Sequence, residues 1–157
     1  MLHIDIVAVG KLKERFWTEA CNEYLKRLKS YAQVNVIEIA DIDPSTSGGV
    51  EAALAKEGAA ILKAIPNDSH VILLDIQGKQ LSSEGIASRL DALALEGTSA
   101  VTFVIGGSTG VDAEVKALAK ERWSFGRITM PHNLARVVLL EQIYRAFKII
   151  RREPYHK

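Results

Sequence analysis

Residues 101–115 read VTFVIGGSTGVDAEV, an apolar, β-branched run that stops at a glycine pair and continues as a polar segment. The run at 101–105 is typical of a buried strand, and Asp112 is a good N-cap for a following helix. A strand, a glycine corner and a helix in succession form the basic unit of α/β proteins. The stretch therefore predicts a strand whose carboxyl end opens on a loop that can approach a ligand closely.

The same unit recurs on both sides of this stretch. An Ala-rich helix is expected at 50–65, and a helix capped by Ser82 or Ser83 is expected to end at Gly97, which sits where a left-handed C-cap glycine would. The other helices are expected at 15–32, 112–120 and 133–151, and the strands at 3–10, 34–41, 70–76, 99–105 and 123–130. This alternation predicts one α/β domain over residues 1–157, with a largely parallel sheet and helices on both faces.

Composition excludes several classes of protein. The chain has 157 residues, of which 48% are hydrophobic and 25% charged, as in ordinary globular domains. No apolar run is long enough for a membrane span, and the first residues do not resemble a signal peptide. A single cysteine, Cys21, excludes an internal disulfide. It lies on the first expected helix, near the apolar stripe, and is expected to be a small residue of the protein core. We therefore expect a cytoplasmic protein without a membrane partner.

Charge is distributed unevenly although the formal net charge is only +1. Residues 1–31 carry six Lys and Arg against four Asp and Glu, and residues 132–157 carry six against two, whereas the middle of the chain is acidic. Two basic ends are compatible with a polyanion-binding face assembled from both termini, and equally with solvated helix ends.

The glycine corner does not have the pattern of a phosphate-binding loop. A Walker loop needs a Lys followed by Ser or Thr, which GGSTGVD lacks, and a dinucleotide fold needs a glycine-rich motif after the first strand, where only Gly10 stands. A Rossmann-type oxidoreductase is therefore disfavoured. On its own, the corner is compatible with a plain turn or with a ligand loop that binds no phosphate.

Six motifs in order resemble one known family. They are VAVGKLKE (7–14), LDIQGKQLSSEG (74–85), FVIGGSTG (103–110), RITMPH (127–132), RVVLLEQIYRAFKI (136–149) and PYHK (154–157). Together they resemble the ribosomal RNA large-subunit methyltransferase H family, which belongs to the SPOUT methyltransferases. The resemblance covers essentially the whole chain.

The resemblance implies both a fold and a reaction. The fold would be a parallel sheet with a C-terminal trefoil knot, and the reaction would transfer a methyl group from S-adenosylmethionine to N3 of a pseudouridine in 23S rRNA. The enzyme would act as a homodimer on the assembled ribosome. Matching motif positions place the cofactor contacts on Leu74, Gly106, Phe125, Gly126, Arg127, Ile128, Thr129 and Met130. Relatives usually carry serine at the position of Gly126.

The C-terminal motif supplies the candidate catalytic residues. An imidazole has an ordinary pKa of about 6.5, so His156 is suited to accept the N3 proton, and Tyr155 could stack on or hydrogen-bond the target base. The resemblance leaves open which of them, if either, is the base. For His132 we favour a structural role, as a hydrogen-bonding residue that starts the last helix. His3 and His70 begin strands and are expected at the surface.

The last helix suggests two interfaces. Arg145, Lys148 and Arg152 follow i, i+3, i+7 spacing and, with Lys157 and the basic N-terminal residues, are candidate contacts to rRNA phosphates. Apolar residues outside its main stripe, such as Val138 and Ile143, suggest burial on more than one side, as in a dimer interface. No cluster has metal-ligand spacing, so no metal is expected. The main alternative is a non-enzymatic module that binds a nucleoside or RNA.

Overall fold

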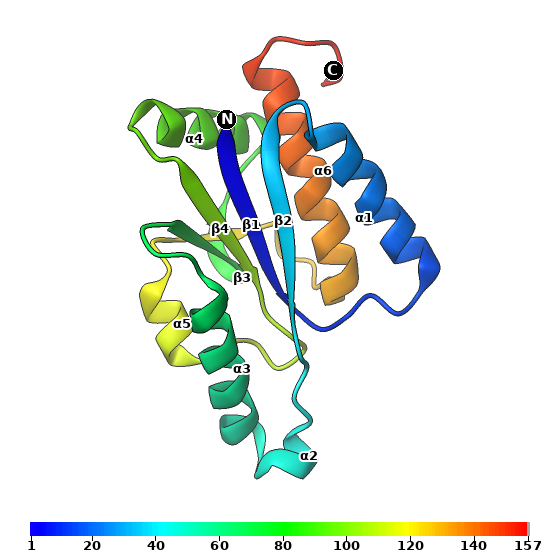
Figure 1. The fold of residues 1–157 in the computed structure, drawn as a ribbon, viewed down its shortest axis with the longest axis vertical. Coiled ribbons are helices and arrows are strands. Elements are labelled where there is room, and N and C mark those ends of the chain that lie inside the picture. Colours follow the sequence, from blue (N-terminus) through cyan, green and yellow to red (C-terminus); the bar gives the residue numbers. More distant parts are fainter. Residues whose placement is uncertain (157) are drawn as a thin grey trace.

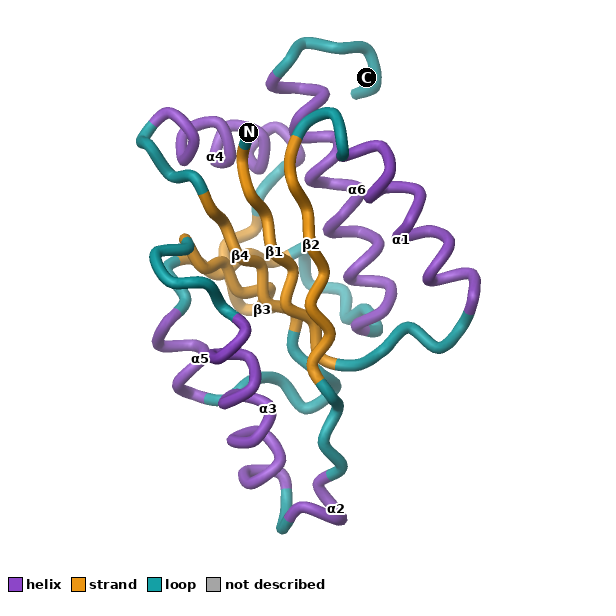
Figure 2. The backbone as a smooth tube through the Cα atoms, in the orientation of Figure 1, coloured by secondary structure: helices purple, strands orange, loops and turns teal. Residues whose placement is uncertain are grey.

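The structure is a computed structural model that describes residues 1–156. Its elements, in chain order, are β1 (Leu2–Val9), α1 (Arg15–Leu28), β2 (Ala32–Ile39), α2 (Pro44–Ser47), α3 (Val50–Ala64), β3 (His70–Gln80), α4 (Ser83–Leu95), β4 (Ala100–Ile105), α5 (Ala113–Leu118), β5 (Glu121–Ser124) and α6 (His132–Ile150). All strand pairs are parallel, in the order β2-β1-β4-β3-β5 (Figures 1 and 2). The expected α/β class is confirmed, and the trefoil knot stays a prediction from the family resemblance.

Side chains alternate between the two faces of the sheet and create two cores. Along β1, Ile4, Ile6 and Ala8 point to the face covered by α1, α4 and α6, and Val7 and Val9 point to the face covered by α3 and α5. Period-two alternation in a strand produces this division. Helices therefore cover both faces, as the strand and helix pattern predicts.

The caps lie where the sequence places them. Ser82 accepts a hydrogen bond from the amide of Gly85 (3.0 Å), and Gly97 follows α4 with φ at +93°. The Asp112 carboxylate accepts from the amide of Ala113 at the start of α5. These side chains satisfy amides that the first turn of a helix leaves unpaired.

The fifth strand is shorter than expected. The prediction of a strand over 123–130 is wrong, because β5 ends at Ser124 and the next residues form a loop. The hydroxyl of Ser124 accepts from the amide of Gly126 and donates to its carbonyl, and Gly126 has φ at +112°. β3 is longer than expected, since Lys79 and Gln80 resume pairing with β5 after a register shift.

Helix α6 is buried on two sides within its own chain. It packs between α1 and α4, so that Leu139 and Ile143 are fully buried. Burial on more than one side is confirmed, and for these two residues it is achieved within the chain itself, so the dimer stays a prediction from the family resemblance. Arg152 lies beyond the last helical residue with φ at +54°, so it does not extend the basic stripe of the helix. Among residues 1–156, no helix combines the length and apolar character needed to cross a bilayer.

Candidate functional site

A cavity of about 660 Å³ opens beside the middle of β3, where its register with β5 shifts, and at the carboxyl end of β4. Residues 73–76 of β3, the glycine corner after β4, and the segment from Trp123 to His132 form its walls. The predicted cofactor residues that line it are Leu74, Gly106, Phe125, Gly126, Ile128, Thr129 and Met130. Arg127 is exposed and lies outside this lining. One cavity thus unites positions that are more than fifty residues apart.

The glycine corner brings backbone, rather than side chains, to the cavity wall. A Cβ on Gly106 would lie 2.6 Å from Cγ1 of Val111 and 3.0 Å from the carbonyl oxygen of Gly110. The turn is closed by a hydrogen bond from the amide of Gly110 to the carbonyl of Gly107 (3.1 Å). Only glycine fits at 106, and the main chain there stands directly against the space that a ligand would fill.

The lining suits a nucleoside-type methyl donor. Leu74, Ile128 and Met130 offer apolar surface for a flat base, and Ile128 is 79% exposed at the rim. Lys116 can pair with an α-carboxylate, and the Asp75 carboxylate, which accepts from the amide of Gln77 and lies 3.7 Å from Arg122, retains lone pairs for a hydroxyl or ammonium group. The residues present therefore fit S-adenosylmethionine. Sequence reasoning missed Lys116, which belongs to no motif, and Asp75, which lies in the quoted motif 74–85 but was given no role.

The C-terminal tail is ordered but lies away from this cavity. The Tyr155 hydroxyl donates to Glu141 (2.8 Å), and His156 is hydrogen-bonded through Nδ1 to Arg145 (3.1 Å) and through Nε2 to Glu84 (2.7 Å). Arg145 is thirteen residues beyond His132, about 20 Å along the axis of α6. The C-terminus accordingly lies at the far end of α6 in Figure 1. None of residues 153–156 lines the cavity of its own chain.

Electrostatics around the tail favour a protonated phenol. Burial and the hydrogen bond to Glu141 raise the pKa of Tyr155 to about 12. In this conformation Tyr155 is a hydrogen-bond donor and not a base at neutral pH. The candidate catalytic pair is thus in contact with α6 and α4, and not with the predicted donor site.

Two of the predicted RNA contacts are already paired. Arg145 binds Glu141 through two nitrogens, and Lys148 donates to Glu153 (2.9 Å) between the rings of Tyr31 and Tyr144. The hydrogen bond to Glu153 is the largest cause that raises the pKa of Lys148, and a hydrogen bond to Tyr31 is the second. Arg152 is exposed, and Lys157 lies outside the described residues.

The structure adds an exposed cation–aromatic cluster on the same end of the molecule. The guanidinium of Arg27 lies 5.4 Å from the ring of Tyr24, and that of Arg151 lies 4.6 Å from the ring of Tyr31. Sequence reasoning missed these arginines. The spacing of Tyr24 and Arg27, three residues apart on α1, was a usable sequence signal for Arg27. Arg151, by contrast, meets Tyr31 only through tertiary packing.

The other histidines and the cysteine occupy distinct environments. His132 lines the cavity, and no hydrogen bond to its ring is formed within residues 1–156. His70 was expected at the surface, but it is largely buried and bonds Glu121. Cys21 is buried as predicted, and burial raises the pKa of its thiol. In the described part of the chain, no group of three or more potential ligands could hold a metal ion.

Comparison with known proteins agrees with this geometry. A model of a family described as predicted SPOUT methyltransferase matches residues 2–156. Proteins named ribosomal RNA large subunit methyltransferase H from Listeria monocytogenes serotype 4b and Desulfitobacterium hafniense are 52% and 51% identical, covering 99% and 100% of this chain and all of theirs.

Solved structures show a related fold at much lower sequence identity. A tRNA (m1G37) methyltransferase from Aquifex aeolicus superposes with a TM-score of 0.56 at 14% identity, over 99% of this chain and 74% of the other. A probable methylase family protein from Haemophilus influenzae gives a TM-score of 0.54 at 15% identity, over 98% and 70%. At such identities the likeness concerns the fold alone.

Proposed function

The chain belongs to the SPOUT methyltransferases and, among them, to the ribosomal RNA large subunit methyltransferase H proteins, and from this premise we propose that it methylates N3 of a pseudouridine in 23S rRNA. Its methyl donor is S-adenosylmethionine, and its substrate is the assembled ribosome in the cytoplasm. Bound in the cavity, S-adenosylmethionine supplies an electrophilic methyl group.

One observation carries this proposal. The cavity brings together the cofactor positions carried over from the family, from Leu74 through Gly106 to Met130, at the carboxyl edge of a parallel sheet. Its apolar walls, its single lysine and its backbone-lined corner match a nucleoside that bears an amino acid. The cavity would hold this donor through Phe125, Gly126, Ile128 and Thr129 as well, while Arg127 stays at the outer surface.

The first experiment is nucleoside analysis by mass spectrometry. Ribosomes that lack the modification are incubated with the protein and S-adenosylmethionine, and 3-methylpseudouridine is expected in the rRNA digest. The Gly106→Val variant is the matched control, because its side chain would fill the corner. A folded native chain that binds the donor and leaves every nucleoside unchanged would favour the non-enzymatic binding module.

We further propose that the functional unit is a homodimer in which the tail of one copy reaches the cavity of the other. The support is geometric, since His156 of a chain is held near Arg145 and Glu84, far along α6 from the cavity of that chain. In the complex, His156 and Tyr155 of the second copy would contact the target nucleotide. Arg145, Lys148, Arg152 and Lys157 would then lie close to the rRNA backbone.

Mixed dimers test this arrangement. Gly106→Val removes the donor site and His156→Ala impairs the tail function, so each homodimer is expected to be much slower than the native enzyme. A heterodimer of the two retains one intact donor site facing one intact tail, and should recover activity. Absence of recovery in heterodimers whose formation is verified would contradict exchange of tails between copies.

A further inference from the structure

We propose that His132 accepts the N3 proton of the target base, and that Arg136 and Glu38 position its ring through Gly10. The inference rests on the proposed methyl transfer and concerns one step of it. It reverses the structural role that the sequence favoured for His132, and leaves the tail with the task of holding the nucleotide.

His132 lines the cavity, and its ring has no hydrogen-bond partner within residues 1–156. It is the first residue of α6. The ring packs on Gly10, where a Cβ would lie 3.1 Å from Nε2. Gly10 also has φ at +97°, a backbone conformation that side chains disfavour. Glycine at position 10 thus makes room for the imidazole at the cavity wall.

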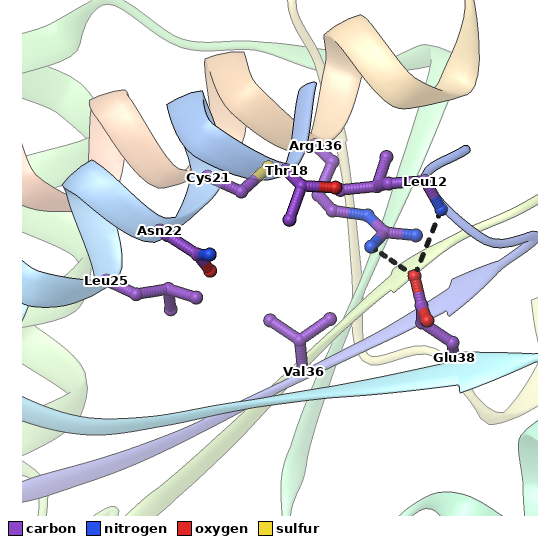
Figure 3. Close-up of a pocket in the computed structure, with 8 residues that line it drawn as sticks. All are labelled: Leu12, Thr18, Cys21, Asn22, Leu25, Val36, Glu38 and Arg136. Carbon is purple, nitrogen blue, oxygen red and sulfur yellow. Dashed lines mark hydrogen bonds and ion pairs between the residues drawn. The ribbon is translucent and has the colours of Figure 1, made fainter. Parts of the chain in front are cut away.

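An ion pair between the buried Arg136 and the partly exposed Glu38 holds Gly10 in this position. The side chain of Arg136 is only 3% exposed, and donates to the carbonyl of Gly10 (3.1 Å) and to Oε2 of Glu38 (2.8 Å). The same carboxylate oxygen accepts from the amide of Leu12, as Figure 3 shows (3.3 Å). One side chain of α6 therefore ties the loop after β1 to the helix that carries His132.

The ion pair is an expensive way to obtain stability alone. Its guanidinium faces a second hollow of about 350 Å³, lined by Cys21, Leu25 and Val36 among others, and Nε of Arg136 is buried without a partner. The buried guanidinium loses its hydration, whereas Glu38 stays partly in solvent and returns only part of that cost. What the pair provides here is a fixed position for the Gly10 carbonyl and the segment that follows it.

His132 also lies between the donor cavity and a basic loop. It lines the cavity, and Gly10, on which its ring packs, is followed by the exposed Lys11 and Lys13 of the loop expected to face RNA. The histidine of the tail is, by contrast, paired with Glu84 and Arg145.

The chemical step balances with a neutral imidazole. The N3–H bond breaks and its proton goes to a ring nitrogen of His132, while the N3 electron pair forms the bond to the methyl carbon. The carbon–sulfur bond breaks and its electrons stay on sulfur, so the positive charge passes from sulfonium to imidazolium. The charged groups around this part of the cavity are Asp75 and Lys116, which line it, and the Arg136–Glu38 pair behind Gly10.

The test compares His132→Gln with the matched variant His156→Gln. Binding of S-adenosylhomocysteine by calorimetry reports an intact donor site, and single-turnover methylation of ribosomes from pH 5 to 9 reports the base. We expect His132→Gln to bind the nucleoside within about threefold of the native value, to lose on the order of 100-fold in rate, and to lose the acidic limb of the pH profile. His156→Gln should retain that limb.

A second pair of variants tests the positioning. Gly10→Ala should displace the ring and slow transfer about tenfold, whereas Gly97→Ala carries the same strain, at φ +93° with nothing within 4 Å of its Cβ, and should leave the rate unchanged. Arg136→Lys should lower the maximal rate without raising KM for ribosomes.

The outcomes separate this inference from the proposed function. A His132→Gln enzyme that keeps its rate and its acidic limb overturns the role of His132, as does loss of the limb in His156→Gln alone. A Gly10→Ala enzyme as fast as Gly97→Ala overturns the positioning. A native chain that methylates no ribosome defeats the proposed function itself.

Discussion

The hydroxyl of Tyr155 donates a 2.8 Å hydrogen bond to Oε2 of Glu141, fourteen residues earlier in the chain. The same carboxylate accepts from Nε of Arg145 at 3.1 Å and from Nη2 at 3.3 Å. Glu141 thereby joins the tail to the middle of α6, and the ring of Tyr155 stacks edge-on against Tyr144. The tail is therefore held by a specific junction with α6, away from the cavity of its own chain.

Glu141→Gln should lower the pKa of Tyr155 from about 12 towards its ordinary value of 10.0, because the carboxylate that disfavours a phenolate is gone. The raised pKa means that the stabilisation from this contact is fully present below about pH 10 and is lost as pH rises towards 12. Absorbance titration of tyrosinate measures the shift, and Tyr155→Phe identifies the signal. An unchanged titration in the glutamine variant would contradict the assignment.

Gly106→Ala should abolish donor binding and reduce stability. Its Cβ would overlap Val111 and the carbonyl of Gly110, so the corner must shift, at a cost of about 1 to 3 kcal/mol. We expect the Kd for S-adenosylhomocysteine to rise at least about tenfold, as measured by calorimetry.

The control for this substitution is Gly97→Ala. It has open space around its Cβ but φ at +93°, and it lies outside the cavity lining, so it should lose stability through strain, about 1 to 2 kcal/mol, and leave donor binding unchanged. If Gly106→Ala binds the nucleoside as tightly as the native chain, the corner does not contact the ligand.

Acid should destabilise the fold partly through Glu121. Burial alone would raise the pKa of this carboxyl, but hydrogen bonds from Trp123, His70 and Arg89 outweigh burial and lower it. The resulting stabilisation is present above the ordinary pKa of 4.5 and is lost as pH falls through the lower folded value. Glu121→Gln should cost about 1 to 3 kcal/mol at pH 7 in urea unfolding, and the two proteins should converge in acid. A difference in the free energy of unfolding that persists at low pH would indicate that packing, and not the charge of Glu121, causes the loss.

Sequence reasoning predicted most of the fold because the relevant signals are local. Ser82, Asp112 and Gly97 cap their helices through their own chemistry, and the apolar run at 70–76 indicated a buried strand. Local pattern failed at 125–130, where a residue at positive φ and a side-chain turn, both invisible to periodicity, end β5 at Ser124.

The residues of the site could also be predicted where the signal is local, and could not be predicted where it depends on tertiary contacts. Family motifs located most of the residues that line the cavity, because three of the motifs include its walls in β3, in the corner after β4 and in the loop after β5. They could not show that His156 is held about 20 Å along α6 from that cavity, since this depends on tertiary contacts with Glu84 and Arg145. Nor could they show that Arg145 and Lys148 are neutralised by Glu141 and Glu153.

This neutralisation leads to a prediction for ribosome binding. Arg151 and Arg152 are exposed and form no ion pair within residues 1–156, so each can release a counterion when it meets a phosphate. Arg151→Ala and Arg152→Ala should each reduce the slope of log affinity against log salt by about 1. Lys148→Ala should change the slope less, because binding RNA would first have to displace Glu153 from Lys148.

Lys63→Ala is the matched control, since Lys63 is an exposed cation on α3, which covers the opposite face of the sheet from α6. Filter binding to ribosomes across a series of salt concentrations compares the four variants. The control should retain the native slope, because a phosphate-binding face at the α1 and α6 end leaves α3 in solvent. Equal slopes in all four variants would contradict a phosphate-binding face at the α1 and α6 end. A reduced slope in Lys63→Ala alone would place the phosphate-binding face on the other side of the sheet.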